Sequence, residues 1–333
     1  MDREQEEMQF LGIFDIYKES YKIIFTWRRI FSQITLSLIL PLSFIFLAHI
    51  QISELIFSNI IDDEIQLDHT SAGSPRNKKL NNLLSSEWTY FWLFKIAYFT
   101  IFLIFSLLST AAVVYTIACI YTGREVTFAK VMSVVPKVWK RLMVTFLCIF
   151  AALFAYNIVA VLLFIAWAFF ISETSIGVLT FIGLLILYFV GIVYMSIIWQ
   201  LSSVVSVLEE ACGVKAMVKS RALIKGKMWV TTIIFFKLNV SLFVIQVAFE
   251  KLVVHGRSLG MVNRVSYGII CFLLLLKLFL FLLVIQTVIY FVCKSYHHEN
   301  IDKSALSDHL EVYLLGEYVP LKAKDVQLEQ YEV

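Results

Sequence analysis

Residues 128–170 read FAKVMSVVPKVWKRLMVTFLCIFAALFAYNIVAVLLFIAWAFF, a basic and aromatic stretch that runs directly into a long apolar one. In its first part apolar side chains recur at helical spacing, with Lys130, Lys137 and Lys140 on the other side. The part after Arg141 exceeds the roughly 20 mostly apolar residues that a membrane-spanning helix needs. The stretch predicts an amphipathic helix, here named a collar, followed by a transmembrane helix.

The same order of segments occurs twice more in the chain. The first collar runs from Phe14 to Phe31 and the third from Gly213 to Trp229. Two spans follow each collar, so the predicted fold is all-α, a polytopic bundle of six transmembrane helices built as three collar-plus-hairpin repeats. Collars of this kind lie in the membrane interface, with cations near anionic headgroups and tryptophans as anchors. The predicted lipid contacts are Trp27, Arg28, Arg29, Trp139, Lys140, Arg141, Lys215, Lys219, Lys225, Lys227 and Trp229. A plainer interpretation is that these cations only satisfy the positive-inside rule.

The composition supports a membrane protein. Of 333 residues, 60% are hydrophobic and 16% charged, whereas soluble domains are about 45–50% apolar and about 25% charged. The mean hydropathy is +0.81. A net charge of +3 is too small to indicate a nucleic-acid partner. The 5 cysteines lie in or at the ends of apolar stretches, which argues against a disulfide framework.

Hydropathy places the boundaries of the spans. We expect an N-terminal segment at 1–29, a C-terminal tail at 294–333, and spans near 30–50, 91–120, 142–171, 177–207, 229–251 and 267–293. Pro41 should kink the first span, because proline removes a backbone donor. The segment 51–90 contains Asp62-Asp63-Glu64 and Ser71-Ala72-Gly73-Ser74-Pro75. We expect it to form a polar, mobile loop.

The positive charges predict an orientation. Lys and Arg number five in each of 1–29, 121–141 and 208–228 and four in 294–333, but three in each of 51–90 and 251–266. Positively charged loops stay in the cytosol. Both termini are therefore predicted to be cytosolic, in the plasma membrane or an endomembrane.

The third collar has a more specific pattern. Its distinctive residues are Glu209, Glu210, Gly213, Ala216, Ser220, Leu223 and Gly226. This order resembles a motif, E-x-x-G-x-x-A-x-x-x-S-x-x-L-x-x-G, of membrane proteins similar to the membrane domain of glycerophosphoryl diester phosphodiesterases. Residues 315–321, LGEYVPL, look like the tail of a family of uncharacterised six-span plant membrane proteins.

The resemblance implies a fold and a location, with no activity attached. The phosphodiesterase relatives carry their chemistry in a separate soluble barrel, for which this chain has no room. Within the motif, Gly213 is expected either to end the fourth span or to open the collar helix, where a positive φ or a close approach is needed. Glu209 and Glu210 are expected to pair with Lys215 or to face the other collar cations. Ser220 and Gly226 are small enough for close helix packing.

Two lysines lie inside predicted spans. Lys237 and Lys277 fall at similar depths, and charges in a membrane usually face a cavity or the bundle interior. One hypothesis is that Lys237, Lys277, Asn239, Gln246 and Gln286 line a cavity for an anionic ligand or headgroup. The alternative is that both lysines extend along the helix toward the interface. Lys95, nearer the outer surface, is expected to do the latter.

The sequence favours a non-enzymatic multi-pass membrane protein that acts through lipid contact or as a membrane scaffold. Catalytic signatures, cofactor motifs and metal-ligand spacings are not found. The alternative is a transporter or channel that moves a small anionic or lipidic solute through the lysine-lined cavity. Tyr318-Val319-Pro320-Leu321 also fits a short sorting signal. The predicted partners are membrane lipids with anionic headgroups, protein partners are unknown, and a homo-oligomer stays open.

Overall fold

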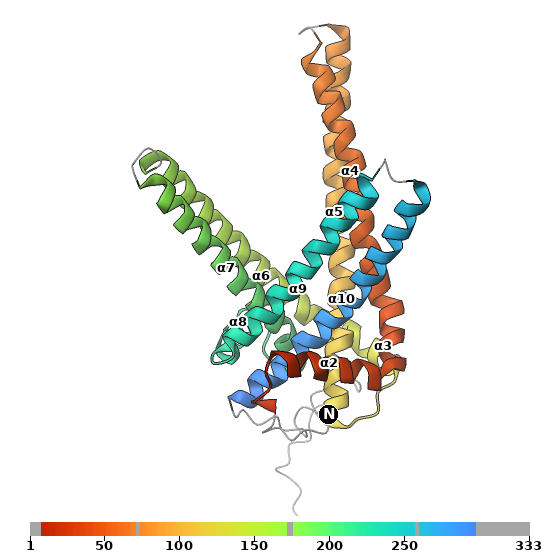
Figure 1. Cartoon of the computed structure of the whole chain (residues 1–333), viewed down its shortest axis with the longest axis vertical. Coiled ribbons are helices and arrows are strands. Elements are labelled where there is room, and N and C mark those ends of the chain that lie inside the picture. The colour runs from red at the N-terminus through yellow and green to blue at the C-terminus, as the bar shows by residue number, and fades with distance from the viewer. Residues whose placement is uncertain (1–7, 71–73, 172–175, 257–259, 298–333) are drawn as a thin grey trace, which may run out of the picture.

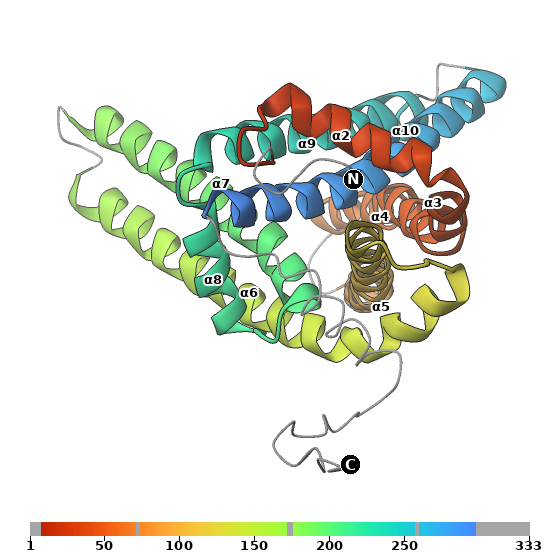
Figure 2. The ribbon, with the colours of Figure 1, turned by 90° about the horizontal axis from the view of Figure 1, so that it is seen from below.

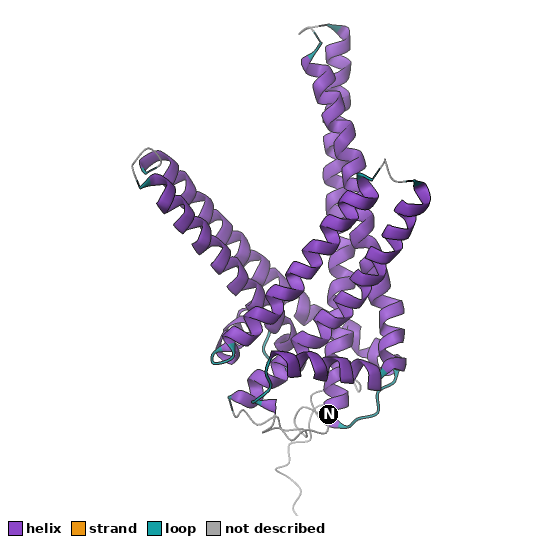
Figure 3. Ribbon diagram, in the orientation of Figure 1, coloured by secondary structure: helices purple, strands orange, loops and turns teal. Residues whose placement is uncertain are grey.

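The computed structural model of the chain describes residues 8–70, 74–171, 176–256 and 260–297. Every regular element in these residues is a helix, and none is a strand (Figure 3). The helices are α2 (Ile13–Thr26), α3 (Arg28–Ile34), α4 (Leu40–Asp68), α5 (Pro75–Thr122), α6 (Phe128–Phe170), α7 (Gly177–Leu208), α8 (Val214–Ile224), α9 (Met228–Phe249) and α10 (Met261–Tyr296). Two short π-helical segments, η1 (Thr35–Ile39) and η2 (Glu250–Val254), lie within this series.

Six helical stretches are long and apolar enough to span a membrane. They are Arg28–Asp68, Pro75–Thr122, Phe128–Phe170, Gly177–Leu208, Met228–Val254 and Met261–Tyr296. Each contains one of the predicted spans or nearly all of it, which confirms, for the described residues, the prediction of an all-helical fold with six helices of membrane-spanning length. The structure is therefore typical of an integral membrane protein.

The long helices form three hairpins that meet at one end of the molecule. In Figure 1 the pairs α4–α5, α6–α7 and α9–α10 converge toward the end that carries α2 and α8, here named the base. Toward the opposite ends, here named the tips, the α6–α7 hairpin diverges from the other two. The buried core lies mainly at the base, where the consecutive stretches 109–121 of α5 and 283–293 of α10 are buried. In the apolar windows of α6 and α7 only 11% of the residues are buried.

The expectation of a mobile loop at 51–90 is wrong. Helix α4 continues to Asp68 and α5 begins at Pro75, so most of this segment forms the outer half of a helical hairpin. Neither glycine nor proline occurs between residues 51 and 68, so no helix-breaking residue interrupts α4 before Asp68. The Oγ of Ser74 accepts a hydrogen bond from the backbone N–H of Asn77 at 3.1 Å, which caps α5.

Pro41, where a kink was predicted, follows closely on a π-helical irregularity in the first span. The π-helical turn of η1 ends at Ile39, and Pro41 occupies the first turn of α4. Proline lacks a backbone N–H and its ring crowds the carbonyl four residues earlier, so a widened turn accommodates it.

The three collars differ in structure. The first contains α2, which breaks at Trp27 before α3, and the third contains α8. The second is the start of α6, a single helix that runs on to Phe170 with Pro136 inside it. Seen from below in Figure 2, α2 lies along α10. The rings of Tyr17 and Tyr21 pack on Phe281 at centroid distances of 5.6 and 4.6 Å, which fixes α2 to the base.

Candidate functional site

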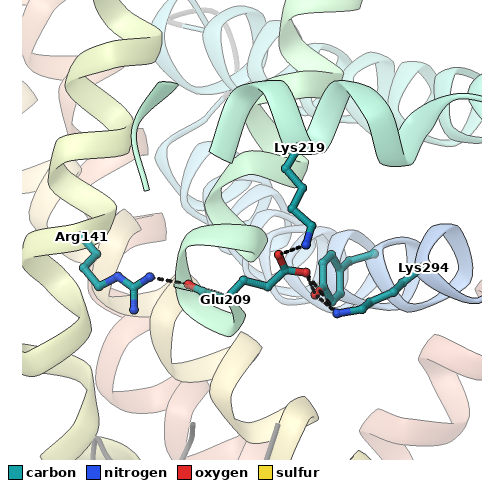
Figure 4. A network of polar contacts seen from close by, with 5 residues as sticks. Arg141, Glu209, Lys219 and Lys294 are labelled. Atoms are coloured by element: carbon teal, nitrogen blue, oxygen red, sulfur yellow. Dashed lines mark hydrogen bonds and ion pairs between the residues drawn. The ribbon is translucent and has the colours of Figure 1, made fainter. Parts of the chain in front are cut away.

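Glu209 lies at the centre of a polar network at the base of the bundle (Figure 4). It follows the last residue of α7. Its Oε1 accepts hydrogen bonds from the Tyr290 hydroxyl at 2.6 Å and from Lys294 Nζ at 3.1 Å, both on α10. Its Oε2 pairs with Lys219 Nζ of α8 at 2.5 Å. The guanidinium of Arg141 on α6 donates to the Glu209 carbonyl, so one residue joins four helices.

The surroundings of Glu209 stabilise its charged form. Its side chain is only 12% exposed. Burial favours the protonated carboxyl, but hydrogen bonds from Lys219 and Tyr290 and the charge of Lys294 outweigh burial and hold the pKa below its ordinary value. Buried ion pairs specify an arrangement more than they add stability, because desolvation offsets much of the attraction. The network therefore fixes how the helices meet.

A second polar contact joins α6, α7 and the start of α8. The Oγ1 of Thr145 accepts a hydrogen bond from the backbone N–H of Gly213 at 2.8 Å and lies 2.7 Å from the Oγ of Ser206. Gly213 has φ of +61° and precedes α8, in agreement with its expected role at the opening of the collar helix. A side chain at Gly213 would also approach Cys148. The turn into α8 therefore depends on the residues of α6.

The remaining motif residues hold α8 and its following turn against the bundle. Ala216, Ser220 and Leu223 are fully buried and lie on one side of α8. Gly226 has φ of +93°, and a Cβ there would overlap the ring of Tyr296 on α10. This close packing by small residues agrees with the expectation for Ser220 and Gly226. These motif residues form the contact surface between α8 with its following turn and the rest of the bundle, here named the seam.

Sequence reasoning missed most of the partners in this seam. Glu210, which occupies the glutamate position of the motif, is exposed, whereas the preceding Glu209 is the centre of the network. Lys215 is exposed, and Glu209 pairs with another collar cation, Lys219, as the second alternative expected, and with Lys294 of α10, which was not expected. Tyr290 and Lys294 are more than 80 residues away in sequence, so no local pattern connects them with Glu209.

The predicted lipid-contact residues divide into two groups. Arg28, Arg29, Lys140, Lys215, Lys225 and Trp229 are exposed at the base, together with Trp27. The others are engaged within the protein: Arg141 and Lys219 in the Glu209 network, and Lys227, whose Nζ lies 5.5 Å from the centre of the Tyr296 ring. Trp139 is half-buried. Only the first group is available to a membrane surface.

The five candidate cavity residues differ in their surroundings. Lys237, Lys277 and Asn239 are exposed on α9 and α10, and Gln246 is partly exposed. Gln286 is buried in α10, and its amide nitrogen has no partner among the described residues. The hollows between α6 and α7 and between α7 and α9 are lined almost wholly by apolar residues, and neither contains these five. The lysine-lined cavity stays a prediction.

Lys95 does not extend into the surroundings as expected. Its Nζ lies 2.9 Å from His49 Nε2 and 2.8 Å from the Ser53 Oγ, both on α4. The same ammonium lies 5.0 Å from the centre of the Phe91 ring. Lys95 therefore joins the two helices of the α4–α5 hairpin, because neighbouring polar side chains replace the water that an extended lysine would seek.

The part of the chain that the structure describes contains six helices of membrane-spanning length, an architecture typical of the polytopic helical membrane proteins. The chain belongs to the family described as domain of unknown function DUF8558, whose sequence profile matches residues 1–331. Comparison with curated proteins and with solved structures finds no match. A link to the phosphodiesterases or to plants stays a prediction. The LGEYVPL tail and Tyr318–Leu321 lie outside the described residues.

Proposed function

We propose that this protein is a non-enzymatic membrane scaffold whose base rests on anionic lipid headgroups at the cytosolic face. The observation that carries the proposal is a set of exposed cations at the base, namely Arg28, Arg29, Lys140, Lys215 and Lys225. Within the described residues none of them has a hydrogen-bond acceptor or an acidic partner for its side chain. Anionic headgroups would supply the missing counter-charges, at about 1 kcal/mol per cation near the surface.

The shape of the bundle supports the scaffold part of the proposal. The Glu209 network joins α6, α7, α8 and α10 at the base. The apolar outer halves of α6 and α7 have few protein contacts and would be surrounded by lipid. We place the base in the cytosol because the excess of Lys and Arg lies there. In this interpretation each of the three collars is the interfacial element of one collar-plus-hairpin repeat.

The test uses the full-length protein in nanodiscs that contain phosphatidylcholine with a minor fraction of fluorescent phosphatidylserine. The wild type should enrich phosphatidylserine around itself, and the enrichment should fall with added salt. Neutralising the five cations to glutamine should abolish it. The matched control neutralises Arg76, Lys78 and Lys79, which are exposed at the tip of the α4–α5 hairpin. Enrichment that survives the base substitutions would contradict the proposal.

The transporter alternative is separated by a second measurement on the same preparations. Proteoliposomes should show no anion flux above empty liposomes if the protein is a scaffold. Flux that is present in the wild type and is lost in Lys277→Leu, with folding intact, would instead support transport.

A further inference from the structure

Two hollows at the base share Arg28. The first, of about 540 Å³, lies between the start of α3 and the connection from α5 to α6; here it is named the arginine hollow. Its lining includes Trp27, Arg28, Arg29, Gln33, Thr127 and Phe128. The second, of about 460 Å³, follows α3 and η1 and is named the apolar hollow. Its lining includes Phe25, Arg28, Phe31, Thr35, Leu36 and Leu280.

The arginine hollow has the character of an anion site. Among the described residues, no aspartate or glutamate lines it. Both Arg28 and Arg29 are exposed, and neither guanidinium makes an ion pair or hydrogen bond with another described residue. A guanidinium offers two parallel N–H donors that match the oxygens of a phosphate. The amide of Gln33 adds an uncharged hydrogen-bonding group to the same hollow.

Thr35 supplies an independent sign of a ligand in the apolar hollow. It is only 8% exposed, and its hydroxyl has no partner in the part of the chain that the structure describes. Buried hydroxyls without a partner are unfavourable and uncommon. Thr35 follows Arg28 by seven residues, which is about two helical turns and about 10 Å along the axis. The unsatisfied hydroxyl therefore lies on the same side of the helix as the arginine.

We propose that the two hollows together bind one anionic glycerophospholipid molecule. Its phosphate contacts Arg28 and Arg29, an ester carbonyl accepts a hydrogen bond from the Thr35 hydroxyl, and an acyl chain packs against Phe31 and Leu280. This site rests on the membrane placement proposed above and adds one specific lipid to the general lipid contact of the base. Inorganic phosphate would fill only the arginine hollow and would leave Thr35 without a partner.

The test measures lipid binding to the full-length protein in a neutral detergent by native mass spectrometry. The probes are dioleoyl phosphatidylserine, dioleoyl phosphatidylcholine and inorganic phosphate. The wild type should bind one phosphatidylserine before any further lipid. Arg28→Gln with Arg29→Gln should weaken this binding at least tenfold, and Thr35→Val at least threefold. The control pair Lys18→Gln and Arg221→Gln, exposed on α2 and α8 at the base, should leave the first lipid within twofold of wild type.

Three outcomes would overturn the inference. Thr35→Val binding like wild type would remove the role of the apolar hollow, and this variant replaces only a hydroxyl by a methyl, so its fold should persist. Competition by inorganic phosphate would identify a free anion as the ligand. If the control pair weakens binding of the first phosphatidylserine as much as the arginine pair does, nonspecific attraction to the positive charge of the base would account for the binding. The proposed function fails separately, through absence of phosphatidylserine enrichment around the wild type in nanodiscs.

Discussion

Glu209→Gln should destabilise the protein far more than the same change one residue later. The substitution removes the charge that Lys219 and Lys294 share. Lys294 is only 16% exposed, so its ammonium would be left nearly buried without a counter-charge. Breaking a buried pair costs about 3–5 kcal/mol. Lys219 is 36% exposed and can turn to water, and Tyr290 can still bond to the amide oxygen. We therefore expect a loss of about 2–4 kcal/mol in the free energy of unfolding.

The measurement is equilibrium unfolding of the full-length protein in mixed micelles, titrated with sodium dodecyl sulfate and followed by tryptophan fluorescence. Glu210→Gln is the matched control, because Glu210 is exposed, and it should change stability by less than about 0.5 kcal/mol. Adding Lys294→Met to Glu209→Gln should recover part of the loss, since it removes the uncompensated ammonium. Equal stabilities of the two glutamine variants, or strict additivity in the double variant, would refute the reasoning.

Further predictions concern pH and the turns around α8. The pKa of Glu209 is lowered, so the stabilisation by its ionised form is complete above the ordinary carboxyl pKa and is lost as the pH falls through the lowered value. The difference in stability between wild type and Glu209→Gln should therefore close in acid. Thermal unfolding across a pH series measures this difference. Gly226→Ala should lower the free energy of unfolding by about 2 kcal/mol or more, because of its φ of +93° and its overlap with a tyrosine ring. Gly123→Ala, at φ of +73° in open space, should lower it by about 1 kcal/mol in the same sodium dodecyl sulfate titration. Thr145→Val should cost about 1–3 kcal/mol, because the N–H of Gly213 loses its acceptor; Thr145→Ser should retain most of the stability.

The sequence predicted the membrane-spanning architecture well because hydropathy is a local property. Each apolar run appears in the structure as a long helix, and the turn at Pro41 follows from the chemistry of one residue. The segment 51–68 was mispredicted because its charges, such as Asp62 and Asp63, indicated solvent. Charge indicates the surroundings of a segment but does not end a helix, and the stretch 51–68 contains neither of the two residues, glycine and proline, that disfavour a helix most.

The candidate site could be predicted only in part for the opposite reason. The pattern from Gly213 to Gly226 marked the seam of α8, since small residues at helical spacing reveal close packing. The pattern could not distinguish Glu209 from Glu210, because the difference depends on α10, which follows much later in the chain. Likewise, the sequence predicted the depth of Lys237 and Lys277 in their spans, but it could not predict whether each side chain faces the bundle or its surroundings.

The length of the α4–α5 hairpin has a consequence for what can approach the protein from the tip side. Helix α5 has 48 residues, which corresponds to about 72 Å at about 1.5 Å per residue, against a hydrocarbon core of about 30 Å. Residues 75–90 precede its predicted span and extend over about 24 Å. If the base is seated at one face of the bilayer, as proposed, this paired rod would rise from the other face as a spacer. A second membrane or a large assembly would meet the rod before it met the lipid.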